Sequence, residues 1–209
     1  MFAIIRARLL PIYIISCGSL FICTALAISP RGTDLPAAAV KQAFARLAQV
    51  KTYRIETKGS VGSTKIDSRI DAQFPDHFHI LNRGLNASEL ILTPDGSFAK
   101  TPDSPWRAVP MSYLSVAESM GPKANDNLLK SMRQVTFKGA AQCPGAAIAK
   151  QYQFETDSGT DAKAPIRTTI TIADASGLPC QIRAQQTATR IDTTASYDYT
   201  SKFSIRAPK

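Results

Sequence analysis

The chain has 209 residues, with 25 Lys and Arg against 16 Asp and Glu and a formal net charge of +9. This length is enough for one domain with a sizeable core, and no internal repeat or low-complexity segment divides it. The basic residues are scattered singly, which is typical of a soluble basic surface, so the charge does not favour a nucleic-acid-binding protein.

The N-terminus has the pattern of an export signal. Arg6 and Arg8 precede an uncharged, largely apolar stretch over 9–29, and Ala25 and Ala27 form a small-residue cleavage site. We therefore predict a signal peptide over 1–27 and a single mature domain over 28–209, located in the periplasm.

Two alternatives to cleavage stay open at this point. The apolar stretch is long enough to remain as an uncleaved membrane anchor. Residues 14–17 resemble a lipobox, which would make Cys17 an acylation site. Cleavage would remove Arg6 and Arg8, leaving a mature charge of +7.

Four cysteines are present, of which Cys17 and Cys23 lie in the predicted signal peptide. The mature domain keeps Cys143 and Cys180, and an even pair in an oxidising compartment indicates one disulfide bond. The strands expected near 148 and 180 start at the same end of the sheet, and the loop at Cys143 is placed to reach over to Cys180. Free thiols or two ligands of a metal site are the alternative interpretations.

The first element predicted after the signal is an amphipathic helix. Asp34 can cap it, Pro36 fits its first turn, and Val40, Phe44 and Leu47 share one face. The pattern then changes to the two-residue period of β-strands, most clearly where apolar and charged residues alternate over 65–74.

The rest of the chain predicts strands around one helical insertion. Residues 111–132 read as helix, broken once at Gly121 and Pro122. Strands are expected near 53–58, 65–74, 78–80, 88–93 and 97–101 before it, and near 134–139, 148–156, 166–172, 180–187 and 190–200 after it.

These elements define an α+β fold. Parallel crossover units are absent from the pattern, so the sheet should be antiparallel. About ten strands with one apolar face each predict a strongly curved sheet, an unclosed β-barrel, with the helices covering its open side.

The search for catalytic chemistry finds no constellation. His77 and His79 share one strand face, but the spacing indicates no third metal ligand, and residues 157–161 lack the rest of a calcium loop. Nucleophile motifs, phosphate-binding glycine loops and zinc-type cysteine pairs are absent. We therefore expect no enzyme, no metal and no cofactor.

One face of the predicted sheet is apolar. Small residues such as Ser68 and Thr168 stand among larger ones there, a mixture that can enclose a cavity as ligand-holding barrels do. An ordinary filled core explains the same residues equally well, and the sequence does not separate the two.

The layout resembles a known family in three stretches. They are the helix running into YRIE at 53–56; FPDHFHI at 74–80 with LILTPDG at 90–96 and SPW at 104–106; and ADASGLP at 173–179 with YDY at 197–199 and FSIRAP at 203–208. In these the chain resembles the bacterial periplasmic lipoprotein-carrier (LolA-like) superfamily, which includes lipid-binding envelope lipoproteins.

The resemblance implies an unclosed antiparallel barrel, helices as a lid and an apolar cavity that takes acyl chains. The lid residues that it implies are Phe44, Leu47, Tyr113 and Leu114. The cavity-lining residues that it implies are Ile66, Ile70, Phe74, Phe78, Ile80, Leu90, Leu92, Trp106, Ile170, Ile172, Ile182, Tyr197 and Tyr199.

Two functional hypotheses follow. The first is a periplasmic carrier of acylated lipid or lipoprotein, anchored to the membrane if the N-terminal segment is not cleaved. The second is a cell-envelope interaction or sensor module with a filled core and a protein partner. A hydrolase is disfavoured because no triad or metal set can be assembled, and we expect a monomer.

Overall fold

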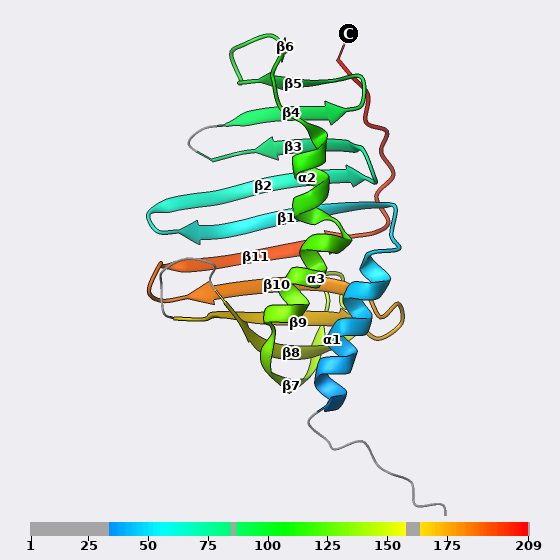
Figure 1. Cartoon of the computed structure of the whole chain (residues 1–209), viewed down its shortest axis with the longest axis vertical. Helices are drawn as coiled ribbons and strands as arrows, with labels where there is room; N and C mark the ends of the chain where they lie inside the picture. Colours follow the sequence, from blue (N-terminus) through cyan, green and yellow to red (C-terminus); the bar gives the residue numbers. More distant parts are fainter. Residues whose placement is uncertain (1–33, 85–86, 158–163, 209) are drawn as a thin grey trace, which may run out of the picture.

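The computed structural model describes residues 34–84, 87–157 and 164–208, so the predicted signal peptide over 1–27 lies outside the described residues. Within this part of the chain, one eleven-stranded sheet carries three helices on one face (Figure 1). The elements are α1 (Asp34–Leu47), β1 (Thr52–Val61), β2 (Thr64–Gln73), β3 (His77–Asn82), β4 (Ser88–Thr93), β5 (Gly96–Lys100), β6 (Arg107–Ala108), α2 (Tyr113–Met120), α3 (Pro122–Ser131), β7 (Arg133–Gln142), β8 (Ile148–Thr156), β9 (Ile166–Ala173), β10 (Pro179–Gln186) and β11 (Ile191–Asp198).

The sheet consists of two antiparallel meanders joined at its centre. Its strand order is β6-β5-β4-β3-β2-β1-β11-β10-β9-β8-β7. The first and last strands in chain order, β1 and β11, therefore pair with each other at the centre of the sheet. Ile55 lies there between Ile70 on β2 and Tyr197 on β11. Because β6 and β7 end at opposite edges, the barrel is unclosed, and the predicted fold class is confirmed.

The helices cover what we call the inner face of the sheet; the opposite side is the outer face. α1 contacts β7 and β10, α2 contacts β3, and α3 contacts β8. In Figure 1 the three helices run across the strands, toward one end of them, and leave the β1–β2 and β10–β11 hairpins uncovered. None of the described helices is both long and apolar enough to cross a membrane.

α1 forms where the sequence predicts it, because its apolar residues recur at helical spacing. Val40, Ala43, Phe44 and Leu47 are all at most 5% exposed, and each large side chain buried in this way contributes roughly 1.5–3 kcal/mol. The helix ends at Leu47, after which the amide of Val50 donates to its carbonyl and leads the chain into β1.

The residues after β11 run along the ends of strands β1 to β5 (Figure 1). The carboxylate of Asp198 accepts hydrogen bonds from the backbone and side chains of Thr200 and Ser201, which turns the chain away from the sheet. Ile205 is then buried, at 7% exposure. This tail is therefore packed against the domain.

Candidate functional site

The inner face of the sheet carries an apolar floor, because alternate residues of each strand point toward the helices. Phe78, Leu92 and Ile170 have no exposed surface, although they come from both halves of the chain. The structure brings these three together with most of the residues predicted to line a cavity. The others in the same cluster are Phe74, Ile80, Leu90, Ile172, Ile182, Tyr197 and Tyr199.

The remaining three predicted lining residues do not belong to this cluster. Ile66 and Ile70 are half-buried on the inner face of β2. The expectation for Trp106 is corrected: its ring lies 4.7 Å from Lys100 Nζ, which is also 2.8 Å from the Glu89 carboxylate on the outer face. This cation–π contact holds the indole on the outer side, away from the floor.

Aromatic rings form the centre of the floor. The ring of Tyr53 stacks on Phe74 with centroids 5.6 Å apart and lies 6.1 Å from each of Tyr197 and Tyr199. Phe74 in turn meets Phe78 edge-on at 5.4 Å. Tyr53 is absent from the predicted site residues, and the two-residue period that puts it on the same face as the apolar residues of β1 is the signal that could have found it.

Burial keeps the floor tyrosines neutral. It raises the pKa of Tyr197 to about 12, and burial together with the neighbouring phenols raises the pKa of Tyr53 and Tyr199 well above the ordinary value. The hydroxyl of Tyr199 donates a hydrogen bond of 2.5 Å to the carbonyl of Pro179. The cluster is therefore apolar at the rings and carries hydrogen-bond donors at its rim.

The predicted lid residues divide between two helices that are held very differently. Phe44 and Leu47 on α1 are 3% and 5% exposed and belong to the main core. On α2 no residue is buried: Tyr113 is only partly covered, and Leu114 is 56% exposed. α1 is therefore part of the core, whereas α2 lies on it.

Gly121 is the single residue between α2 and α3. It is extended, with φ −80° and ψ −177°, and serves as the last cap of α2 and the first cap of α3. A methyl group at this position would lie 2.4 Å from the carbonyl oxygen of Ala117, so only glycine fits without a shift of α2.

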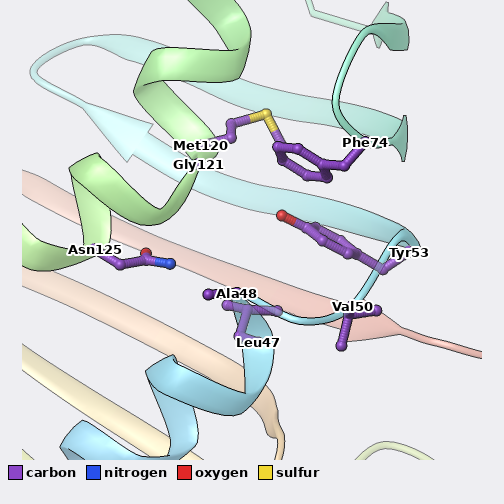
Figure 2. Close-up of a pocket in the computed structure, with 8 residues that line it drawn as sticks. All are labelled: Leu47, Ala48, Val50, Tyr53, Phe74, Met120, Gly121 and Asn125. Carbon is purple, nitrogen blue, oxygen red and sulfur yellow. The ribbon is translucent and has the colours of Figure 1, made fainter. Parts of the chain in front are cut away.

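A small cavity lies where the three helices meet the floor (Figure 2). It has a volume of about 20 Å³ and is lined by Leu47, Ala48, Val50, Tyr53, Phe74, Met120, Gly121 and Asn125. A cavity of this size has room for about one water molecule. The hydroxyl of Tyr53 and the side-chain amide of Asn125 both point into this space.

A wider groove opens at the hairpin end of the sheet, which the helices leave uncovered. Its volume is about 290 Å³, and Ile66, Ser68, Asn82 and Ser88 line it from β2, β3 and β4, together with Lys65. Ile66, Ser68 and Asn82 alternate with the outer-face residues, and Ser68 lies opposite Asn82 across the sheet. The groove therefore includes inner-face residues at the hairpin end of the sheet, and Lys65 and Asp67 add charged groups to it.

The outer face carries a network of charges. Arg54 donates to both oxygens of Asp71, at 2.6 and 3.1 Å, and the carboxylate is almost entirely buried, at 4% side-chain exposure. The third guanidinium nitrogen of Arg54, Nη1, donates a hydrogen bond to the hydroxyl of Ser201. The guanidinium carbon lies 5.7 Å from the centroid of the Phe203 ring. The charge pair therefore also fastens the C-terminal tail.

The two histidines lie in this network. His79 Nε2 is 2.7 Å from Glu89 Oε1, and His77 Nδ1 is 2.6 Å from Asp76 Oδ1. Although burial opposes it, hydrogen bonds from Lys100 and His79 hold the pKa of Glu89 below its ordinary value. Among the described residues, no group of three or more His, Cys, Asp and Glu is placed to hold a metal ion.

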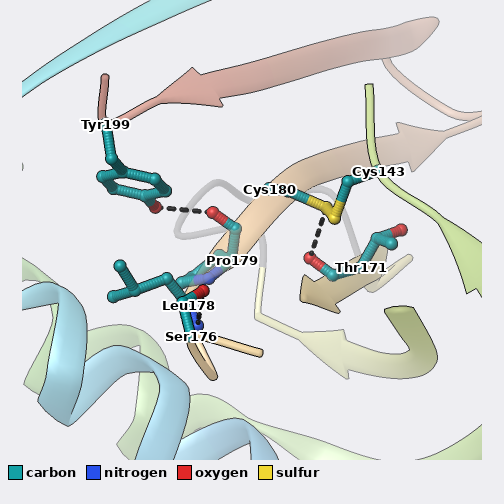
Figure 3. The surroundings of a disulfide bond; sticks show 7 residues. All are labelled: Cys143, Thr171, Ser176, Leu178, Pro179, Cys180 and Tyr199. Carbon is teal, nitrogen blue, oxygen red and sulfur yellow. Dashed lines mark hydrogen bonds between the residues drawn. A yellow bond between two sulfur atoms is a disulfide. The ribbon is translucent and has the colours of Figure 1, made fainter. Parts of the chain in front are cut away.

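The predicted disulfide bond between Cys143 and Cys180 is confirmed (Figure 3). It links the loop after β7 to β10, and the Cα atoms are 5.7 Å apart. Both cysteines are buried, and they form a second, smaller cluster with Ala149 and Ala173. The bond therefore stabilises the half of the sheet that lies beyond β11.

Comparison with known proteins identifies a shared fold. No protein-family model matches the sequence, and no curated protein matches it. Among solved structures, MucB is similar with a TM-score of 0.50 and 8% identity over 82% of this chain and 63% of that chain. The chain thus spans less than two thirds of the length of MucB.

Two further structures are similar at lower scores. The MucA/MucB complex of Pseudomonas aeruginosa gives a TM-score of 0.45 and 6% identity, covering 78% of this chain and 55% of that chain. A DUF1329 family protein from Desulfovibrio piger gives 0.36 and 7%, covering 79% and 91%. At these identities the likeness to MucB shows the fold, and fold alone does not assign an activity.

Proposed function

We propose that this protein is a periplasmic binding or carrier protein that buries the acyl chain of a lipid or lipoprotein against the inner face of its sheet. The observation that supports this best is the attachment of α2, a helix with no buried residue above an apolar, aromatic floor. Elements held by few buried contacts open at low free-energy cost. Displacing α2 would uncover a surface suited to an alkyl chain.

In this mechanism α2 swings about Gly121 while α1 stays in place. Each CH₂ group that leaves water for the floor contributes about 0.8 kcal/mol, so ten of them contribute roughly 8 kcal/mol. That gain has to exceed the cost of moving α2, which the exposure of its residues keeps small. The groove lined by Ile66 and Ser68 is our proposed entrance, because it is open and is formed by β2, β3 and β4, the last two of which carry the floor residues Phe78 and Leu92.

The proposal assigns no catalytic step and no cofactor. The proposed location of the protein in the periplasm rests on the export pattern at its N-terminus. A segment of this kind directs export whether it is cleaved or stays as an anchor. The ligand would be neutral or amphiphilic and would be held by burial, so binding would be reversible.

The alternative is an envelope interaction or sensor module that binds a protein and no lipid. One observation favours it: the cavity beneath the helix junction is only about 20 Å³ and cannot hold an alkyl chain without movement of a helix. The two functions differ in whether α2 opens for an apolar ligand.

Native mass spectrometry of the mature protein from its own envelope, followed by lipid extraction, tests the proposal first. The delipidated protein is then titrated with a fluorescent fatty acid. Ser68→Trp places a large ring in the groove, whereas Thr194→Trp places the same ring on the outer face, opposite Lys58 and Arg183.

We expect a co-purifying acyl species and saturable uptake that Ser68→Trp weakens and Thr194→Trp leaves unchanged. A bare protein that takes up no fatty acid would refute the carrier function and support the interaction module. Equal uptake by both variants would show that the ligand does not use the groove.

A further inference from the structure

Two polar side chains meet in an otherwise apolar cavity. The space beneath the helix junction is walled mainly by carbon and sulfur from Leu47, Phe74 and Met120. Among its described lining residues, Tyr53 on β1 and Asn125 on α3 contribute the polar side-chain atoms, and Figure 2 shows both aimed at the same space.

Neither of these groups has a partner within the described part of the protein. The hydroxyl of Tyr199, in the same aromatic cluster, donates to the carbonyl of Pro179, but no hydrogen bond joins Tyr53 or Asn125 to another described side chain through their polar ends. Tyr53 as a whole is only 3% exposed. The Tyr53 hydroxyl and the Asn125 amide open onto the cavity, so a ligand or a bound water there can complete their hydrogen bonds.

The chemistry of the pair points to a neutral acceptor. Burial, reinforced by Tyr197, raises the pKa of Tyr53, so its hydroxyl keeps its proton and can donate at any physiological pH. The amide of Asn125 can donate as well. No Lys, Arg or His stands among the described residues that line the cavity, so no described side chain there would balance the charge of a carboxylate or phosphate.

We propose that Tyr53 and Asn125 form a polar subsite that binds the carbonyl oxygen of an acyl ester or amide. The volume of about 20 Å³ suits a single oxygen atom. The alkyl chain attached to that carbonyl would continue over Phe74 under α2. This inference rests on the proposed function and deepens it, because it specifies the linkage that the site recognises and separates acyl esters and amides from ethers and plain hydrocarbons of the same length.

The test compares two ligands of equal length on the delipidated protein, by displacement of a fluorescent acyl probe. One is methyl hexadecanoate, and the other is hexadecyl methyl ether, which lacks the carbonyl. Tyr53→Phe removes the hydroxyl and keeps the ring, and Asn125→Leu removes the amide. Asn127→Leu is the matched control, because Asn127 lies on α3 like Asn125 but is exposed and does not line the cavity.

We expect Tyr53→Phe to weaken binding of the ester by about 3- to 10-fold, the effect of one neutral hydrogen bond, and to leave the ether unchanged. Asn125→Leu should act in the same direction, and Asn127→Leu should leave the preference for the ester as it is. Thermal unfolding of each variant establishes that the domain is folded, and Asn125→Leu keeps the test available if Tyr53→Phe does not fold.

The possible outcomes distinguish a failure of the carbonyl subsite from a failure of the proposed acyl-binding function. If the wild-type protein binds neither ligand, the proposed function fails. If it binds both equally and Tyr53→Phe changes nothing, the carbonyl subsite is refuted while acyl binding stands. If an unacylated peptide displaces the probe and Tyr53→Phe abolishes that displacement, the subsite belongs to a peptide carbonyl and the acyl assignment is overturned.

Discussion

Removing the Cys143–Cys180 bond should destabilise the domain by about 4 kcal/mol. The cysteines are 37 residues apart. In the chain-entropy model, opening a loop of this length returns about 13 cal/mol/K to the unfolded chain, which is about 4 kcal/mol at 25 °C. Both cysteines are 7% exposed and pack against Ala149, so replacing them with alanine also removes two buried sulfur atoms.

Urea unfolding followed by circular dichroism measures this loss on the oxidised protein, the reduced protein and the Cys143→Ala/Cys180→Ala double variant. With an m-value of about 2 kcal/mol/M, the midpoint should fall by roughly 2 M urea. The reduced protein isolates the loss of the cross-link, because it keeps the sulfur atoms. A loss below about 1 kcal/mol in the reduced protein would refute the argument that the bond acts by restricting the unfolded chain.

Three further outcomes are expected. Asp71→Ala should cost about 3–5 kcal/mol in urea unfolding because it leaves Arg54 without its buried partner, whereas Asp192→Ala, at an exposed pair, should leave the midpoint nearly unchanged. Burial raises the pKa of Tyr197 to about 12, so the stability that depends on its neutral phenol is complete below pH 10 and is lost as the pH rises toward 12. The part of the phenolate absorbance that is missing from Tyr197→Phe should therefore appear only with alkaline unfolding. Amide hydrogen exchange should be faster in α2 than in α1, and equal protection would contradict the proposed lid.

The sequence predicts the fold well because local periodicity determines which face of each element is buried. Alternation over 65–74 predicts β2, helical spacing predicts α1, and the pair at Gly121 and Pro122 predicts the break between α2 and α3. The disulfide bond is predicted by counting cysteines outside the signal segment. Each of these depends on residues close together in the chain or on a single possible pairing.

The site is less predictable because it depends on contacts between distant segments. The alternation over 65–74 predicts that Asp71 faces solvent. It is nonetheless only 3% exposed, because Arg54 and Arg69 pair with its carboxylate and the C-terminal tail contacts Arg54. Trp106 is held by Lys100 on the outer face in the same way. Tyr53 and Asn125 line one cavity because α3 packs against α1, which no spacing in the sequence encodes.

The outer-face contacts link successive strands to one another independently of the helices. On the outer face, charge pairs from Arg54 through Asp71 and His79 to Glu89 and Lys100 connect five successive strands, β1 to β5, without involving a helix. The curvature of the floor therefore does not depend on α2. A ligand that displaces α2 would meet a floor already shaped for it, so the free energy of binding would be reduced only by the cost of moving one weakly held helix.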